Sequence, residues 1–133
     1  MKKILVLTIL LVIMIAIVGC TSETNSKLEY VDLSPSEAKE LIDNTMDLVI
    51  IDVSPYFAQG HIPGALNYYI GDGSLDDAIP SLDKNNTYLV YCHSDSASIS
   101  GANKLIDAGF KNVYRLEGNY AAWVAAGYAI DND

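Results

Sequence analysis

The residue most able to do chemistry is Cys92, which follows an apolar run, residues 87–91, and precedes a polar segment. A thiol at the end of a strand faces loop amides and the positive end of a following helix, and both favour the thiolate. A thiolate attacks sulfur or phosphorus electrophiles. The alternative is an inert buried cysteine, but Ala97 is the only apolar residue close behind Cys92, which disfavours burial in the core. The position therefore predicts a reactive thiol.

The second cysteine, Cys20, closes a leader, residues 1–19, in which two lysines precede an apolar run broken only by Thr8. A positive start and a short apolar run are typical of a secretory signal. At about 1.5 Å per residue the run spans roughly 22 Å, less than the roughly 30 Å hydrocarbon core of a bilayer. The ending Ile17-Val18-Gly19-Cys20 resembles the lipobox of prokaryotic lipoproteins.

The lipobox resemblance implies that the leader is cleaved before Cys20 and that the Cys20 thiol carries a lipid. The chain is then expected to be a membrane-anchored lipoprotein on the extracytoplasmic side, with residues 20–27 as a polar tether and residues 28–133 as one domain. An uncleaved anchor that ends in a chance cysteine is the alternative. With Cys20 lipidated, Cys92 is the only free thiol and no intramolecular disulfide can form.

Charge and composition narrow the possible functions. The chain has 8 Lys and Arg residues against 17 Asp and Glu residues, a net charge of −9. Loss of the leader removes Lys2 and Lys3 but no acid, which leaves six bases against seventeen acids and a net charge of −11. Binding to nucleic acid needs clustered Lys and Arg, so we expect no nucleic-acid partner. A hydrophobic fraction of 50% excludes a disordered chain.

The elements that must position Cys92 alternate between helix and strand. Ser34, Pro35 and Glu37 have the pattern of a capping box and predict a helix start. The β-branched run 48–53 and the run 87–91 predict strands buried on both faces. A stripe of apolar residues predicts a helix over 96–108, with Gly109 as its C-terminal cap. A strand over 112–116 and a helix over 119–126 complete an α/β domain with a mainly parallel sheet.

Several motifs, in order along the chain, resemble those of the single-domain rhodaneses, or thiosulfate sulfurtransferase-like domains. They are Asp52-Val53, Gly60-His61-Ile62-Pro63-Gly64-Ala65, Val90-Tyr91-Cys92, Gly109-Phe110-Lys111-Asn112-Val113-Tyr114, Leu116-Glu117-Gly118, Ala122-Trp123 and Gly127-Tyr128. The resemblance covers nearly all of residues 28–130. It implies a rhodanese-like three-layer α/β domain, with a mainly parallel central sheet flanked by helices.

The resemblance also implies a chemistry. Cys92 would take sulfane sulfur from a donor, hold it as a persulfide, and pass it to a thiophilic acceptor, with no metal and no organic cofactor. Donor and acceptor would be small molecules or protein persulfides. The active loop that would support the anionic sulfur consists of His93, Ser94, Asp95, Ser96, Ala97 and Ser98.

The chain departs from the family pattern at the active loop. Many active members read Cys-x-x-Gly-x-Arg-Ser there, whereas this chain has Asp95 at the Gly position and Ala97 at the Arg position. The common Asp-Val-Arg ends in Ser54, and the second Gly after Leu-Glu is Asn119. Loss of a charge-assisted contact removes about 1.5–3 kcal/mol, or roughly ten- to a hundredfold in binding. Asp95 and the acidic chain repel anions, so we expect weak activity on thiosulfate and less effect on neutral donors.

Four residues are expected to support the site. His93 neighbours the nucleophile and would stabilise the thiolate if protonated, or else be a solvated loop histidine. Arg115 lies near the C-terminal end of its strand, where parallel sheets bind ligands, or else makes a surface salt bridge. His61 is expected to hold a turn by hydrogen bonding, and Asp52 to support the site structurally.

Three other functions compete with sulfur transfer. A phosphatase of this fold needs Cys-x5-Arg, and Ser98 occupies the Arg position, which disfavours a phosphatase. A catalytically degenerate binding module is favoured by Ser54 and Ala97 but opposed by the retained Cys92. Redox use of Cys92 would require an intermolecular disulfide, since no resolving cysteine remains.

Overall fold

The structure, a computed structural model, describes residues 26–133. The predicted leader, the lipidation site Cys20 and most of the tether lie outside the described residues. In residues 26–133 no helix is both long enough and apolar enough to cross a membrane.

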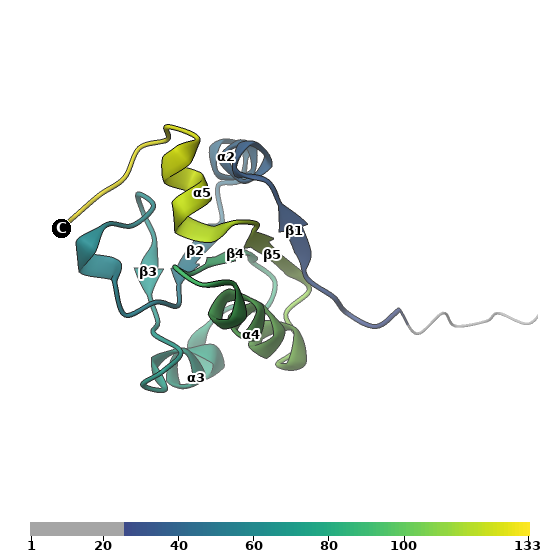
Figure 1. Cartoon of the computed structure of the whole chain (residues 1–133). Helices are drawn as coiled ribbons and strands as arrows, with labels where there is room; N and C mark the ends of the chain where they lie inside the picture. The colour runs from purple at the N-terminus through teal and green to yellow at the C-terminus, as the bar shows by residue number, and fades with distance from the viewer. Residues whose placement is uncertain (1–25) are drawn as a thin grey trace, which may run out of the picture.

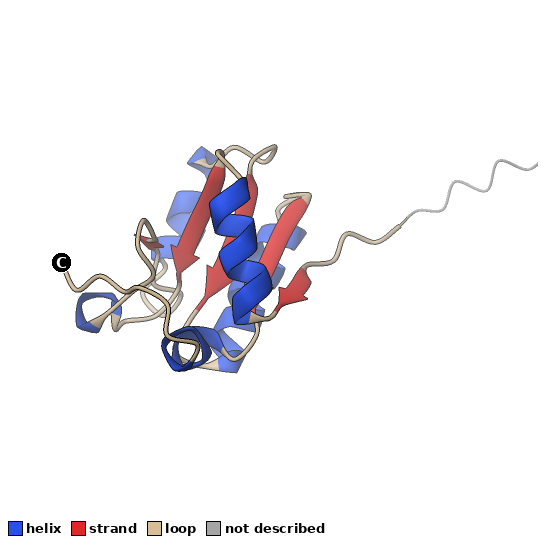
Figure 2. Ribbon diagram, turned by 90° about the horizontal axis from the view of Figure 1, so that it is seen from above, coloured by secondary structure: helices blue, strands red, loops and turns tan. Residues whose placement is uncertain are grey.

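The centre of the domain is a five-stranded sheet in which every pairing between strands is parallel. In spatial order the strands are β1 (Val31–Leu33), β5 (Asn112–Leu116), β4 (Thr87–Tyr91), β2 (Leu48–Asp52) and β3 (Leu66–Asn67). Figure 2 shows the sheet with helices on both of its sides. Because β4 is the middle strand, the residue that follows it, Cys92, emerges at the centre of the carboxyl edge, where ligands of parallel sheets bind.

Helices cover both faces and complete three layers (Figure 1). One face carries α3 (Ser74–Ala78) and α4 (Asp95–Asp107), and the other carries α2 (Pro35–Asn44) and α5 (Asn119–Ala125). Two 3-10 turns, η1 (Phe57–Gln59) and η2 (Ile79–Ser81), lie in the connections. The predicted α/β architecture with a parallel sheet flanked by helices is confirmed.

The start of α2 follows the expected capping box. The Ser34 hydroxyl accepts a hydrogen bond from the Glu37 amide at 3.4 Å, and the Glu37 carboxylate accepts one from the Ser34 amide at 2.8 Å. Two orphan amides of the first turn region are thereby satisfied. Pro35 occupies the first helical position, where its missing N–H costs nothing.

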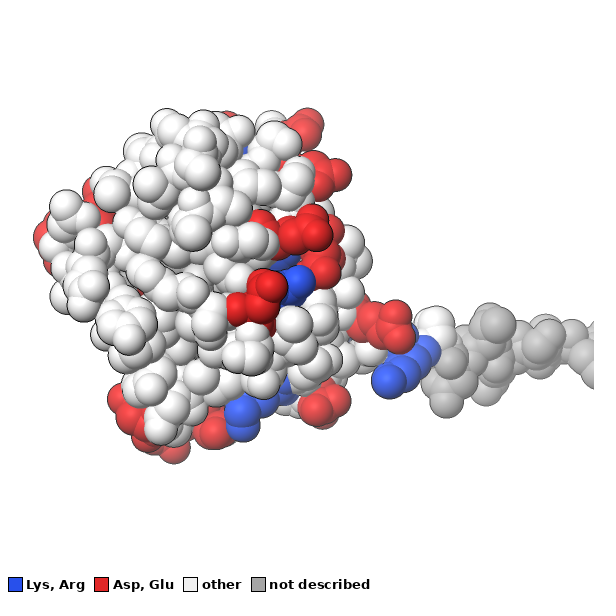
Figure 3. All heavy atoms as spheres, in the orientation of Figure 1, with Lys and Arg blue, Asp and Glu red and all other residues white. Residues whose placement is uncertain are grey.

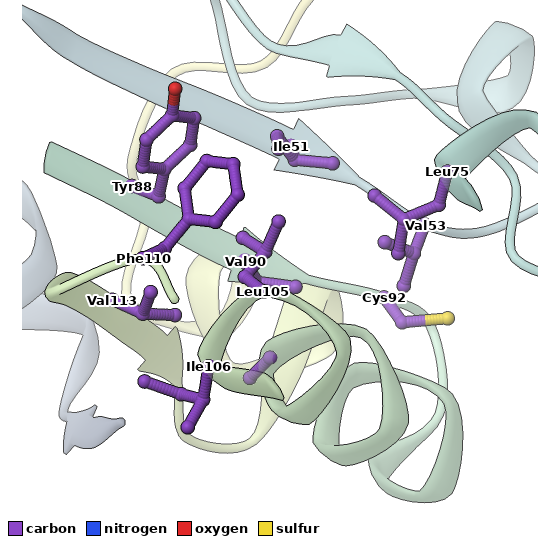
Figure 4. Packing of buried hydrophobic residues seen from close by; sticks show 11 residues of the cluster. Ile51, Val53, Leu75, Tyr88, Val90, Cys92, Leu105, Ile106, Phe110 and Val113 are labelled. Carbon is purple, nitrogen blue, oxygen red and sulfur yellow. The ribbon is translucent and has the colours of Figure 1, made fainter. Parts of the chain in front are cut away.

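Alternation along β4 divides the core into two clusters. Tyr88 and Val90 pack toward α4, together with Leu105 and Phe110 (Figure 4). Leu89 and Tyr91 point to the opposite face, toward α2 and α5. Side chains of successive strand residues point to opposite faces, so a strand buried on both sides reads as a continuous apolar run.

Element boundaries differ from the sequence prediction in a few places. Strands β4 and β5 have the predicted ends, and β2 ends one residue early, at Asp52. Helix α4 begins at Asp95 rather than Ser96, and Gly109 follows it with φ +90°, a left-handed conformation that suits glycine. The short strands β1 and β3 and the helix α3 were not predicted.

Candidate active site

Cys92 is buried, with 3% of its surface exposed. The expectation that its polar neighbours would keep it out of the core is therefore wrong, because residues distant in sequence, such as Val53 and Leu75, pack in the same cluster. Figure 4 shows its sulfur at the edge of the core cluster, pointing away from Val90 and Leu105. The sulfur lies 3.9 Å from the Ser94 hydroxyl. The thiol is thus enclosed but sits at the end of the core, beside the start of α4.

A pocket of about 220 Å³ opens at Cys92. Its lining comes from three stretches of chain that follow β2, β3 and β4: Val53, Pro55, Tyr56, Tyr69, Ile70, Cys92, His93, Ser94 and Ala97. Most of these side chains are apolar or aromatic, and neither Lys nor Arg is among them. A concave pocket with a candidate nucleophile on its wall is the expected form of a small-molecule site.

The predicted active loop is shorter than expected because most of it is helix. Only Cys92, His93 and Ser94 lie between β4 and α4, while Asp95, Ser96, Ala97 and Ser98 form the first turn of α4. First-turn amides have no acceptor within their own helix, and they carry the positive end of the helix dipole. The Ser98 amide is the first to bond within the helix, to the Ser94 carbonyl at 3.3 Å. The other first-turn amides therefore lie next to the thiol-bearing turn and suit an anionic sulfur.

His93 is held between two aromatic rings. Its ring stacks on Tyr120 at a centroid distance of 4.5 Å and lies tilted against Tyr56 at 5.5 Å. The residue itself is exposed and lines the pocket. His93 is therefore an ordered rim residue rather than a freely moving loop histidine.

Arg115 is buried, and each of its three guanidinium nitrogens donates to a side chain of the protein. Its Nε and Nη2 donate to the two carboxylate oxygens of Asp32 at 2.7 and 3.0 Å. Its Nη1 donates to Asp95 at 3.1 Å and to the Ser98 hydroxyl at 3.2 Å. Burial alone lowers the pKa of Arg115, but the hydrogen bonds and charge of Asp32, aided by Asp95, outweigh burial and raise it. Arg115 does not line the pocket. It forms salt bridges, as the alternative predicted, but it is buried and not at the surface.

Asp52 and His61, the other two predicted supporting residues, do not line the pocket. Asp52 is fully buried, and its Oδ1 accepts from the Ser54 amide at 2.8 Å, while its Oδ2 has no hydrogen-bond partner. The His61 ring stacks on Phe57 at 3.7 Å, and its Nδ1 donates to the Phe57 carbonyl at 3.0 Å. Backbone hydrogen bonds of 2.9 Å in both directions join His61 to Asp131. His61 holds a turn, as predicted.

In the described part of the chain one group of side chains has metal-ligand types within reach of one another: His61, Asp131 and Asp133, with ligand atoms all within 4.8 Å. Both carboxylates are exposed, and the group does not include Cys92. Exposed acids commonly gather without an ion, and we assign no metal to it.

Comparison with known proteins now identifies the fold family. Residues 34–126 match the family described as "Rhodanese-like domain". The chain belongs to this family.

Curated and solved relatives of this rhodanese-like domain agree with that assignment. A protein named thiosulfate sulfurtransferase GlpE from Ectopseudomonas mendocina is 35% identical over 97 residues, which cover 73% of this chain and 87% of the relative. Its namesake from Coxiella burnetii is 36% identical over 98 residues, covering 72% and 89%. The solution NMR structure of the rhodanese-like domain of the Anabaena protein Alr3790 aligns with a TM-score of 0.70 at 30% identity, covering 79% of this chain and 81% of that one.

Two positions at which this rhodanese-like domain departs from the common pattern touch each other. Asp95 Oδ1 accepts a hydrogen bond from Asn119 Nδ2 at 2.7 Å, and Asn119 Oδ1 accepts one from the Cys92 amide at 3.2 Å. Asn119 has φ +58°, the only positive φ of a non-glycine among the described residues, and asparagine tolerates this conformation. We name this chain of contacts, from Arg115 through Asp95 and Asn119 to Cys92, the loop latch.

The loop latch changes the expectation for Asp95. The sequence predicted a free negative charge beside the thiol, but the carboxylate is matched by Arg115 and by an amide donor. Sequence reasoning gave Asn119 no role in the site and overlooked Asp32, Tyr56 and Tyr69 altogether. A local signal existed only for Asn119, a non-glycine where the family commonly has glycine.

Proposed function

We propose that this rhodanese-like domain transfers sulfane sulfur through a persulfide on Cys92. The observation that carries the proposal is the position of the thiol: it follows the central strand, lines the 220 Å³ pocket, and lies beside the first turn of α4. The similarity to proteins named thiosulfate sulfurtransferase supports the same reaction class. Ser98 in place of an arginine argues against phosphoryl chemistry at this thiol.

The transfer proceeds in two balanced steps. The Cys92 thiolate attacks the sulfane sulfur of a donor, forming a new S–S bond while the bond between that sulfur and the rest of the donor breaks, and the donor remnant leaves with the electron pair. An acceptor thiolate then attacks the outer sulfur of the Cys92 persulfide, and the Cys92 thiolate leaves. First-turn amides of α4 favour the negative charge on sulfur in both steps.

Weak activity on thiosulfate is part of the proposal. Thiosulfate is a dianion, yet no Lys or Arg lines the pocket, and Ala97 lines it at the position where the family commonly has arginine. Arg115 is committed to Asp32 and the loop latch. Figure 3 shows that acidic side chains outnumber basic ones on the visible face, which repels anions further at low salt.

We also propose that the domain is anchored to the membrane on its extracytoplasmic side by a lipid on Cys20. The proposal depends on the leader and on the Ile17-Val18-Gly19-Cys20 ending. The intact mass of protein extracted from the membrane of a bacterial host tests it. We expect a chain that begins at a lipid-modified Cys20, and a chain that begins at unmodified Met1 would refute the lipoprotein proposal.

Mass spectrometry tests the sulfur-transfer proposal directly. Purified protein is treated with thiosulfate or with cysteine persulfide, and the Cys92 peptide is expected to gain the mass of one sulfur atom, faster with the persulfide. Cys92→Ser should gain none, whereas the matched variant Cys20→Ser should behave like the parent chain. Absence of a sulfur adduct at Cys92 with both donors would reject sulfur transfer and favour the binding-module alternative.

A further inference from the structure

We infer that the Cys92 pocket selects an organic persulfide, R–S–SH, whose organic group R is small and apolar. This inference rests on the proposed sulfur transfer and names the class of its donor. The pocket walls, their charge and their rigidity each support it.

The walls have the character and size that fit such a group. Val53, Pro55, Ile70 and Ala97 offer aliphatic surface, and Tyr56 and Tyr69 offer aromatic surface. A cavity of roughly 150 Å³ lined by apolar side chains is large enough for benzene. At about 220 Å³, this pocket therefore has room for a phenyl-sized or branched alkyl group together with the two sulfurs of a persulfide.

The charge of the lining disfavours a charged organic group. His93 is the only lining residue of a basic type, and its ring stacks on Tyr120 at the rim. The cation of the loop latch, Arg115, already donates to Asp32, Asp95 and Ser98. A carboxylate on R would lose water in this pocket without gaining a cationic partner, which is costly.

Aromatic contacts hold the pocket walls in place before any ligand arrives. Any side chain at position 71 would collide with the Tyr69 ring, so Gly71 permits the close approach that places this ring at the pocket. The Tyr56 ring packs at a tilt against the His93 ring, which in turn stacks on the Tyr120 ring. Walls that are already positioned add to affinity because no further ordering is needed on binding.

The selected donor reacts with a balanced exchange of bonds. The Cys92 thiolate attacks the outer sulfur of R–S–SH, the S–S bond of the donor breaks, and R–S⁻ leaves. The sulfhydryl proton stays on the transferred sulfur, so Cys92 becomes Cys92–S–SH and the total charge is unchanged. No oxidant or reductant is required.

Two persulfides that differ only in R test the inference. The rate of sulfur addition to Cys92 is measured with benzyl persulfide and with the persulfide of mercaptosuccinate, which carries two carboxylates. Each rate is divided by the rate of the same donor with free glutathione, which corrects for intrinsic reactivity. We expect the corrected rate with benzyl persulfide to be at least about tenfold higher.

A variant pair locates the selectivity in the pocket. Ala97→Arg places a cation on the wall and is expected to raise the rate with the dicarboxylate about tenfold. Val124→Arg adds the same charge at an exposed site on α5 outside the pocket and should leave the donor ratio unchanged.

The outcomes separate the inference from the proposed function. Equal corrected rates for both persulfides, each dependent on Cys92, would overturn the apolar selectivity and leave sulfur transfer intact. An equal response to Ala97→Arg and Val124→Arg would also overturn it. If neither persulfide nor thiosulfate modified Cys92, the proposed function and the inference would fall together.

Discussion

Strand β4 lies between two strands that each carry a buried charged side chain, and the two sides differ in how that charge is matched. On the β5 side, Arg115 donates to Asp32, Asp95 and Ser98. On the β2 side, Asp52 accepts through one carboxylate oxygen only, and the other oxygen has no partner. Residues of both strands pair directly with β4, so the contrast flanks the thiol itself.

The difference shows how this domain uses its polar groups near Cys92. On the β5 side Arg115 is hydrogen-bonded to Asp32, Asp95 and Ser98 and belongs to the loop latch, so this cation is not available to a substrate. On the β2 side one oxygen of the buried Asp52 carboxylate has no hydrogen-bond partner, and the charge of this carboxylate acts on neighbouring groups such as Tyr91. Neither side offers a free cation to the pocket, which leaves the pocket apolar.

The largest effect is expected when the ion pair between Arg115 and Asp32 is removed. Asp32→Ala leaves the Arg115 guanidinium, whose side chain is 7% exposed, without its two-point partner. Removing one partner of a buried ion pair costs about 3–5 kcal/mol. Because the Asp32 side chain is 43% exposed and Asp95 still accepts from Arg115, we expect about 2–3 kcal/mol of lost unfolding free energy. Urea unfolding followed by circular dichroism measures this loss.

The matched control for that prediction is Asp43→Ala. It breaks an exposed i,i+4 pair with Lys39 on α2, which contributes about 0.5 kcal/mol or less. Equal losses in the two variants would show that the β5 side is no more than a surface ion pair.

The second prediction concerns the β2 side and follows the ionisation of Tyr91 at alkaline pH. Burial, followed by the negative charge of Asp52, raises the pKa of Tyr91 above its ordinary value of 10.0. The unfolded chain therefore releases this proton first, so the stabilisation present below pH 10 is lost as pH rises above 10. The loss approaches about 1.4 kcal/mol per pH unit. Unfolding free energies measured between pH 8 and 11 are expected to show this decline.

Tyr91→Phe removes the titrating hydroxyl and should reduce the alkaline decline. It also costs about 1 kcal/mol at neutral pH, because the Ile62 amide loses the Tyr91 hydroxyl as its acceptor. Burial likewise raises the pKa of Tyr88, on the opposite face, so Tyr88→Phe is the comparison and should reduce the decline less. A decline unaffected by Tyr91→Phe would contradict the role given to the β2 side.

The smallest effect is expected within the loop latch. Asp95→Gly and Asn119→Gly restore the common family residues singly and together, and a double-mutant cycle isolates their contact from changes in helix propensity. Because the Asp95 side chain is 70% exposed, we expect a coupling of about 1 kcal/mol or less. The losses of unfolding free energy in the distant pair Asp95→Gly and Asp43→Ala should be additive. Additive losses for Asp95→Gly and Asn119→Gly would contradict an energetic link between these two residues of the loop latch.

Much of the fold could be predicted because its signals are local. Strands β4 and β5 have the predicted ends, since a strand buried on both faces is a continuous apolar run bounded by polar residues. The capping box of α2 also lies within four residues. Strands β1 and β3 have three and two residues and give no periodic signal, so they were missed.

The candidate site was predicted less completely because it is built from distant segments. Cys92 is buried in one core cluster with Val53, Leu75 and others that lie many residues away in sequence. The charge of Asp95 is matched by Arg115 and Asn119, separated from it by 20 and 24 residues. A reading of neighbours along the chain could identify the nucleophile but not its surroundings.

Helix α4 separates the N-terminal segment of the described chain from Cys92. Ser26, Lys27 and Leu28 line a hollow together with Ile106 and Asp107, at the C-terminal end of this helix, whereas Cys92 precedes its N-terminal end. With 13 residues the helix is about 20 Å long. The start of the described chain, at Ser26, and the reactive sulfur therefore lie near opposite ends of α4. If the proposed lipid on Cys20 holds the domain at a bilayer, the end of α4 beside the thiol is the end farther from the anchored segment, and Cys92 would face diffusing sulfur carriers.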